Sequence, residues 1–428
     1  MKTSKSQFLQ LGMLILSNAL VGGTTAADGN KKGTDIARSP TASLTAAAAS
    51  DLPTRVDVPT PFAPRTEVAS NGEALVQVAL LLDTSGSMEG LIDQARCQLW
   101  NVVSELSKAK RHGSPITLQI AVYQYGSRNI PSELGYLKQV LSFTDNLDEV
   151  SAALFSLTVG GSNEHCGQVI GAAINGLEWA ENPDVYKAIF IAGNESFDQG
   201  PTSFGDLLSP ITSRALVLNT IFCAKRSGSQ KFTGGTNQWS SAARLVGGLY
   251  STIDHNHHLP EMKTPFDEKM RELNREMNES FVWYGDGADE AAKNQRVQDA
   301  NARKLSDHAF AARMSAKIGH LYHHVHHDLV DAIAHGKADI AIMSAGDMPA
   351  LMKKLSHSER MEFIAEKTRQ RQAVRRQMAD LITRRHAFLE EKMNRSGDNG
   401  SDRSLVLGEA LAKSIRAQAE RKGYVFTH

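Results

Sequence analysis

The sequence has 428 residues, of which 41% are hydrophobic and 22% charged, and its 47 basic side chains balance its 47 acidic ones. This balance argues against a nucleic-acid binder that depends on bulk positive charge. No apolar run reaches the roughly 18 residues that a membrane-spanning helix needs, which argues against a polytopic membrane protein. At about 100 to 200 residues per domain, the length allows two or three domains.

Residues 1–27 are typical of a signal peptide for export. Lys2 and Lys5 precede an apolar stretch, and a run of small residues follows it, so we expect cleavage near Ala26 or Ala27. A short membrane anchor is the alternative interpretation. The signal predicts an exported protein, either periplasmic or secreted.

Residues 28–70 are rich in Ala, Ser, Thr, Pro and Lys and lack a periodic apolar pattern, which predicts a disordered linker. In 71–258, by contrast, apolar runs alternate with amphipathic segments. The expected strands are 74–82, 116–125, 136–143, 188–192, 215–223 and 249–253. The expected helices are 89–110, 147–157, 167–180, 203–213 and 239–246. This alternation predicts an α/β fold with a doubly wound, mostly parallel, Rossmann-like sheet, which binds ligands at the carboxyl ends of its strands.

Residues 259–428 are expected to be an α-helical region with a possible coiled coil. The expected helices are 264–279, 288–336 and 356–394, with a short extended segment at 281–284. The last helix has an apolar stripe with a spacing near 3.5, interrupted by Arg385 and made of Val374, Met378, Leu381, Phe388 and Met393. Such a seam packs on another helix, either in this chain or in a second copy that would make a homo-oligomer.

The first strand ends in Asp83-Thr-Ser85-Gly-Ser87-Met, at the point where such a sheet presents its ligand loop. A carboxylate and two hydroxyls at alternate positions suit a hard divalent cation that prefers oxygen ligands. Helix capping without a metal is the alternative. The chain has no Gly-x-Gly-x-x-Gly after this strand, no phosphate loop and no Gly-x-Ser-x-Gly, so we expect that it is not an enzyme.

This strand, loop and helix resemble the Asp-x-Ser-x-Ser segment of the von Willebrand factor type A (VWA) domain family, which opens the metal-ion-dependent adhesion site (MIDAS). The resemblance covers 71–258 and implies that Ser85 and Ser87 coordinate Mg²⁺ (or Mn²⁺) directly. It also implies that Asp83 acts largely through water, and that one position stays open for a carboxylate from a protein ligand. The whole chain is similar to exported bacterial VWA-domain proteins with a helical C-terminal half.

Two further loops carry the rest of the site that the resemblance implies. Ser162, after Gly160-Gly161, stands where the family has Thr, and Asn194 stands where the family has Asp. Glu164 or Glu195 could restore the missing charge. With fewer anionic ligands, Mg²⁺ is expected to bind weakly and to demand a carboxylate from the partner more strongly.

The sequence therefore predicts an exported protein that binds an unknown protein through a VWA domain with an atypical MIDAS. The partners that we expect include no nucleic acid, and we expect no transmembrane span. A scaffold of the cell envelope without metal, whose helical half does the binding, is the alternative.

Histidines suggest a third hypothesis, a metal-handling protein. Within 320–327, the pairs His320 with His324 and His323 with His327 are spaced i,i+4, which on a helix suits Zn²⁺ or Cu²⁺. His326 lies in the same stretch, and His255, His257 and His258 form a second group. Ordinary surface or core histidines are the interpretation that we favour.

The three cysteines are Cys97, Cys166 and Cys223. Cys166 opens a predicted helix and Cys223 ends a predicted strand, so both are expected at the carboxyl face of the sheet, as neighbours able to form a disulfide. Cys97 is expected to be a buried free thiol.

Overall fold

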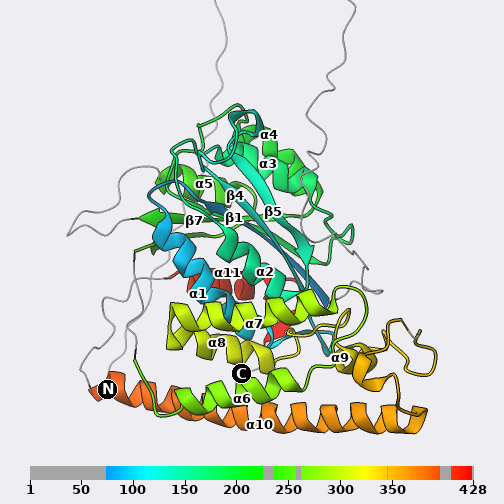
Figure 1. Ribbon diagram of the computed structural model, residues 1–428. Helices are drawn as coiled ribbons and strands as arrows, with labels where there is room; N and C mark the ends of the chain where they lie inside the picture. The colour runs from blue at the N-terminus through cyan, green and yellow to red at the C-terminus, as the bar shows by residue number, and fades with distance from the viewer. Residues whose placement is uncertain (1–73, 225–235, 257–261, 345, 396–405, 427–428) are drawn as a thin grey trace, which may run out of the picture. The chain divides into compact units, whose positions relative to one another are not determined.

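The computed structural model describes residues 74–224, 236–256, 262–344, 346–395 and 406–426 (Figure 1). The predicted signal peptide and linker lie outside these described residues. No helix within the described ranges is both long and apolar enough to cross a membrane.

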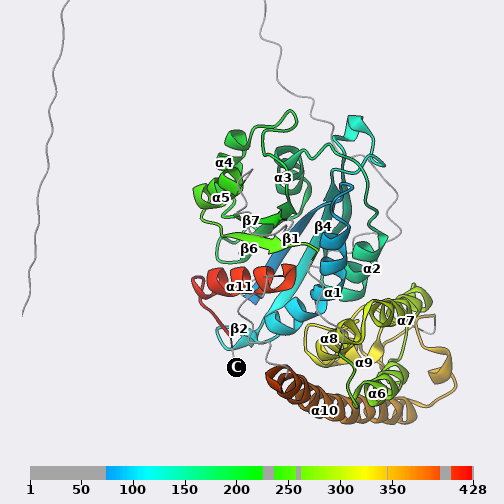
Figure 2. The same ribbon diagram turned by 90° about the vertical axis from the view of Figure 1, so that its left-hand side faces the viewer.

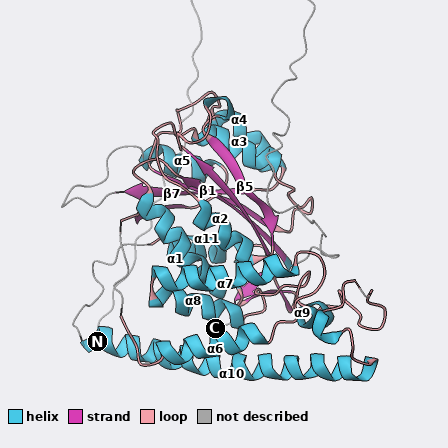
Figure 3. Ribbon diagram, viewed as in Figure 1, coloured by secondary structure: helices cyan, strands magenta, loops and turns pink. Residues whose placement is uncertain are grey.

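A six-stranded sheet in the order β5-β4-β1-β6-β7-β8 lies at the centre of the first part of the chain (Figure 3). Its strands are β1 (Leu75–Asp83), β4 (Thr117–Tyr125), β5 (Leu137–Thr144), β6 (Tyr186–Gly193), β7 (Val217–Ala224) and β8 (Tyr250–Asp254). All neighbouring strands are parallel except β5, which runs antiparallel to β4. The predicted doubly wound, mostly parallel sheet is confirmed.

Helices cover both faces of this sheet, as Figure 2 shows. One face carries α1 (Glu89–Leu106) and α2 (Leu147–Ser156), and the other carries α3 (Cys166–Gly176), α4 (Phe204–Ser213) and α5 (Thr236–Leu245). Side chains of β1 alternate between the two hydrophobic cores: Leu80 joins the core of α1, whereas Leu81 joins the core of α3. This is why β1 reads as a continuous apolar run.

The chain then forms a group of helices, which we call the inserted helices. They are α6 (Asp267–Glu279), α7 (Ala288–Leu305), α8 (Asp307–Ile318), α9 (Leu329–Ala334) and α10 (His357–Arg395). A short 3₁₀ helix, η3 (Ala350–Met352), lies between α9 and α10, and another, η2 (Ser132–Leu134), lies before β5 in the first part of the chain. The single helix predicted over 288–336 is therefore wrong. Ser306 is extended, with φ −175°, and caps α8, and Asp328 caps α9 by accepting from the Asp331 N–H. The extended segment predicted at 281–284 forms only an isolated bridge, between Trp283 and Asp328.

The predicted seam of α10 packs inside this chain. Val374, Met378 and Leu381 are buried in the core that α6 and α8 share, and the Phe388 ring meets the Phe266 ring edge-on at 6.1 Å. Arg385, which interrupts the stripe, is buried and donates to Asp267 at 2.9 Å. Met393, predicted as the end of the stripe, is 40% exposed.

The last elements return to the first part of the chain. The helix α11 (Leu407–Glu420) packs along α1 and against β6, β7 and β8 (Figure 2). The strand β9 (Tyr424–Phe426) pairs antiparallel with β2 (Ala109–Arg111), which also pairs with β3 (Ser114–Pro115). The predicted helical character of 259–428 is therefore confirmed, and β9 is a short strand that the prediction does not include. The predicted division after residue 258 does not separate two cores, because α11 shares the core of α1.

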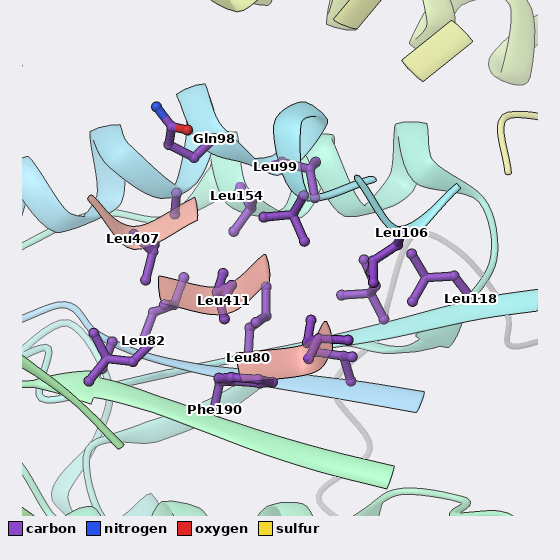
Figure 4. A pocket seen from close by; sticks show the side chains of 17 residues that line it. Leu80, Leu82, Gln98, Leu99, Leu106, Leu118, Leu154, Phe190, Leu407 and Leu411 are labelled. Atoms are coloured by element: carbon purple, nitrogen blue, oxygen red, sulfur yellow. The ribbon is translucent and has the colours of Figure 1, made fainter. Parts of the chain in front are cut away.

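Figure 4 shows the layer between α1, α11 and the sheet. It encloses an internal cavity of about 30 Å³, whose lining is apolar except for Gln98. A cavity of this size and polarity stays dry, so the layer acts as a packed core. This core fixes the sheet whose carboxyl edge carries the candidate site.

Candidate metal site at the carboxyl edge of the sheet

Asp83 is the last residue of β1 and is completely buried. Two glycines from the neighbouring strands leave room for its carboxylate. A Cβ atom at Gly126, after β4, would lie 2.9 Å from Asp83 Oδ1, and a Cβ atom at Gly193, the end of β6, would lie 3.1 Å from Oδ2. The sheet therefore presents the carboxylate between two positions where larger residues would crowd it.

Hydrogen bonds from backbone N–H groups fix the loop after β1 and join it to the loop before α3. The Ser85 N–H donates to Asp83 Oδ1 at 2.7 Å, the Gly86 N–H donates to the Gly161 carbonyl at 3.1 Å, and the Gly160 N–H donates to the Thr84 carbonyl at 2.8 Å. Gly160 and Gly161 have φ of +146° and +126°, which favours glycine. The structure thus holds the predicted Asp83 and Ser85 beside the loop that carries Ser162.

The exposure of the predicted ligands divides them into three groups. Ser85 and Glu164 are 3% exposed, whereas Ser87 and Ser162 are exposed. Asn194 and Glu195 follow Gly193 directly and are partly exposed. Two hydroxyl-bearing residues of the predicted set therefore face solvent, while Ser85 and Glu164 are buried.

Three buried oxygens at this edge have no hydrogen-bond partner among the described residues: Asp83 Oδ2, Ser85 Oγ and Asn194 Oδ1. Leaving a buried polar atom unpaired costs about 1–3 kcal/mol, so three in one place demand an explanation. A hard divalent cation coordinates oxygens of this kind. The donor set therefore fits the ion that the sequence predicts.

The negative charges at this edge also favour a bound cation. Burial, together with the negative charges of Glu164 and Glu195, raises the pKa of Asp83 to about 7. Burial and Glu195 also raise the pKa of Glu164. No Lys or Arg forms an ion pair with these three carboxyl groups in the described part of the chain. A divalent cation would relieve their mutual repulsion.

The two candidates for the second carboxylate differ in position. A Cβ atom at Gly126 would lie 3.0 Å from Glu164 Cγ as well as 2.9 Å from Asp83 Oδ1, so these two side chains flank one point. Glu195 Oε2 instead accepts from Gln199 Nε2 at 3.2 Å, and its charge raises the pKa of Asp83 less than that of Glu164 does. Glu164 therefore lies in the better position to restore the missing charge.

Sequence reasoning missed two neighbours of these ligands. Gln199 accepts from the Glu164 N–H at 3.2 Å while donating to Glu195, so it connects the two loops. The exposed Arg128 follows β4, its N–H donates to the Gly160 carbonyl at 2.7 Å, and its side chain lies beside Gly160. Because Arg128 stands just after a buried strand, the sequence could have predicted it as a residue near the site. Nothing in the sequence predicts that Gln199 lies there.

No group of three or more His, Cys, Asp or Glu side chains arranged to hold a metal occurs in the described ranges. A metal at this edge would therefore depend on hydroxyl and amide oxygens, which suits Mg²⁺ better than a soft ion. The histidines of 320–327 do not form the predicted helical pairs, because residues 319–328 are turns and loop. His324 is instead buried among the rings of Phe281, Trp283 and Tyr322. His255 is buried, and His257 and His258 lie outside the described residues.

The expected disulfide is not formed, since Cys166 and Cys223 are buried free thiols. The Cys166 thiol contacts the Tyr125 hydroxyl at 4.0 Å, and the Cys223 thiol contacts the Ile221 carbonyl at 3.8 Å. Each thiol therefore has its own polar neighbour. Cys97 is free as expected, but it is partly exposed rather than buried.

Comparison with known families agrees with this geometry. Residues 77–205 match the model of the von Willebrand factor type A domain, and the chain therefore contains a VWA domain. A comparison with curated protein sequences gives no match.

Among solved structures, the chain is similar to the conserved hypothetical protein BatB from Bacteroides thetaiotaomicron, with 14% identity and a TM-score of 0.32 over 42% of this chain and 90% of that one. It is similar to proximal thread matrix protein 1 from the mussel byssus with a zinc-occupied MIDAS motif, with 14% identity, a TM-score of 0.32 and 42% of each chain covered. A von Willebrand factor type A structure from Catenulispora acidiphila has 15% identity and a TM-score of 0.29, over 42% of this chain and 39% of that one.

Proposed function

We propose that this chain binds another protein through a divalent cation held at the carboxyl edge of the VWA sheet. The observation that carries this proposal is the set of three buried, unpartnered oxygens on Asp83, Ser85 and Asn194. Oxygens that lack protein donors are available to an ion without breaking any existing hydrogen bond.

The ion is Mg²⁺ or Mn²⁺, bound weakly. Its ligands at the buried side are Asp83, Ser85 and Asn194, and Glu164 supplies the second carboxylate in preference to Glu195. Ser87 and Ser162 complete the set from the exposed side. Because most of these ligands are neutral, the bound ion keeps much of its positive charge and favours an external carboxylate.

The protein ligand supplies that carboxylate at the solvent-facing side of the ion. Binding rather than catalysis is the proposed role, because this edge presents oxygen ligands for a cation and the sequence carries no Gly-x-Ser-x-Gly and no phosphate loop. Export to the periplasm or beyond rests on the sequence of residues 1–27.

Calorimetric titration of the full chain with Mg²⁺ and with Mn²⁺ tests the proposal. Asp83→Ala should abolish binding and Ser87→Ala should weaken it. Glu133→Gln is the matched control, since it removes an exposed carboxylate from η2. An absence of binding in the parent chain, or equal binding in the parent and Asp83→Ala, would defeat the proposal.

A scaffold that binds through its helical half is the second candidate. Ile342 and Leu351, in the segment between α9 and α10, are 84% and 77% exposed, which is unusual for large apolar side chains. Such binding would be insensitive to EDTA and to Asp83→Ala, whereas the metal-dependent function would be lost in both cases.

A further inference from the structure

Two histidines that lie apart in the sequence meet beside the inserted helices. His323 lies in the loop between α8 and α9, and His335 follows the end of α9. The centroids of their imidazole rings are 5.2 Å apart, with an angle of 47° between the ring planes. The pair is therefore made by the fold and is not one of the i,i+4 pairs that the sequence suggests.

Both rings offer nitrogen lone pairs. His335 Nδ1 lies 2.8 Å from the Asp331 carbonyl oxygen, which can only accept, so Nδ1 carries the proton and Nε2 keeps its lone pair. The His323 ring makes no hydrogen bond with any described residue. Burial lowers the pKa of His323, which favours its neutral form.

The residues around the pair hold it in place. Asp331, whose carbonyl orients His335, has its carboxylate bound by Arg371 at 2.8 Å and by the His324 N–H at 2.9 Å. A second residue that fixes the tautomer and orientation of a histidine is the usual support for a metal ligand. The Asp145 carboxylate, from the loop before α2, acts electrostatically on His323 and adds negative charge nearby.

The separation of the rings matches coordination of one ion. With a Zn–N distance of about 2.05 Å and a tetrahedral angle, two imidazole ligands have ring centroids roughly 5 Å apart. We propose that His323 and His335 together bind a borderline transition-metal ion, with Zn²⁺ as the expected metal. No third His, Cys, Asp or Glu converges with them in the described ranges, so the remaining positions are filled by water or by a bound molecule.

Titration with Zn²⁺ of the full chain carrying Asp83→Ala, in which the carboxyl edge does not contribute, tests this proposal. His335→Gln and His323→Gln should each weaken Zn²⁺ binding by at least about tenfold. His326→Gln is the matched control, because it removes an exposed imidazole from the same turn and should leave the affinity unchanged. If His323→Gln fails to fold, the exposed His335 still provides the test.

Electron paramagnetic resonance of the chain with one equivalent of Cu²⁺ gives a second readout. The nitrogen superhyperfine pattern should show two imidazole ligands in the parent and one in His335→Gln. Equal Zn²⁺ affinity in His335→Gln and His326→Gln, or no Zn²⁺ binding by the parent, would overturn the proposal.

Discussion

Arg313 in α8 and Asp148 in α2 form an ion pair of 2.7 Å between two completely buried side chains. Arg313 also donates to Asp299 at 2.6 Å, and its guanidinium lies over the Trp100 ring at 4.6 Å. Although burial opposes ionisation, the positive charge of Arg313 holds the pKa of Asp148 well below its usual range. This network joins the inserted helices to the helices that cover the sheet.

Removing Arg313 should therefore destabilise the whole chain. Arg313→Met leaves Asp148 without its main counter-charge in a buried position, which costs roughly 3–5 kcal/mol. Urea denaturation followed by circular dichroism measures this loss in the free energy of unfolding.

The control for this substitution is Arg369→Met. Arg369 also pairs with two acids, Glu362 and Glu366, but its side chain is 57% exposed. Water and salt screen exposed ion pairs, so this variant should be nearly as stable as the parent. Equal losses in the free energy of unfolding in the two variants would show that the buried ion pairs contribute no more to stability than the exposed ones.

A second prediction concerns α11, whose Leu411 fills the apolar layer between α1 and the sheet (Figure 4). Leu411 is 6% exposed, so Leu411→Ala should lower the free energy of unfolding by about 2–5 kcal/mol. Val425→Ala, at a side chain that is 63% exposed, should change it by less than about 0.5 kcal/mol. A small effect of Leu411→Ala would mean that the packing of α11 contributes little to the free energy of unfolding.

The sequence predicts the sheet well because β1 and its neighbours carry strong local patterns, and the motif at Asp83, Ser85 and Ser87 follows from the strand that precedes it. It does not predict where α11 packs, since an apolar stripe such as Leu407 and Leu411 fits any apolar surface. The three residues of β9 are too few for a periodic pattern. Likewise, the choice between Glu164 and Glu195 depends on how two loops approach Gly126, which only the tertiary structure shows.

A third prediction concerns the seam of α10. Leu381 is 6% exposed in the shared core, so Leu381→Asp should bury an unpaired charge, and the melting temperature should fall by several degrees. Met393→Asp, at a 40% exposed side chain of the same helix, should have little effect. Because the seam is occupied within the chain, the mass in solution should be the same for both variants. A change of mass in Leu381→Asp alone would point to an interface between copies.

The fourth prediction separates the two candidates for the second carboxylate. Glu164→Gln should weaken Mg²⁺ binding nearly as much as Asp83→Ala, whereas Glu195→Gln should have a small effect. Asn194→Asp should strengthen binding, because it adds an anionic ligand. Calorimetry on these variants gives the order, and a large loss in Glu195→Gln together with no gain in Asn194→Asp would favour Glu195 instead.

The last prediction follows from the pKa of Asp83, which burial raises to about 7. A carboxyl group whose pKa is higher in the folded state binds its proton more tightly there than in the unfolded chain. Its contribution to stability is therefore complete below about pH 4 and is lost as the pH rises through about 7. Without metal, the parent should lose stability over this range relative to Asp83→Asn, which cannot titrate at this position.

The affinity for Mg²⁺ should instead increase as the pH rises, because Mg²⁺ competes with the proton on Asp83. At pH 5.5 only a few per cent of Asp83 is ionised, so the apparent affinity for Mg²⁺ should be about thirtyfold lower than at pH 8. The rise in melting temperature on adding Mg²⁺ should accordingly be large at pH 8 and small at pH 5.5, and Asp83→Asn should show none at either pH. A rise of equal size at both pH values in the parent would mean that the ion does not bind at Asp83.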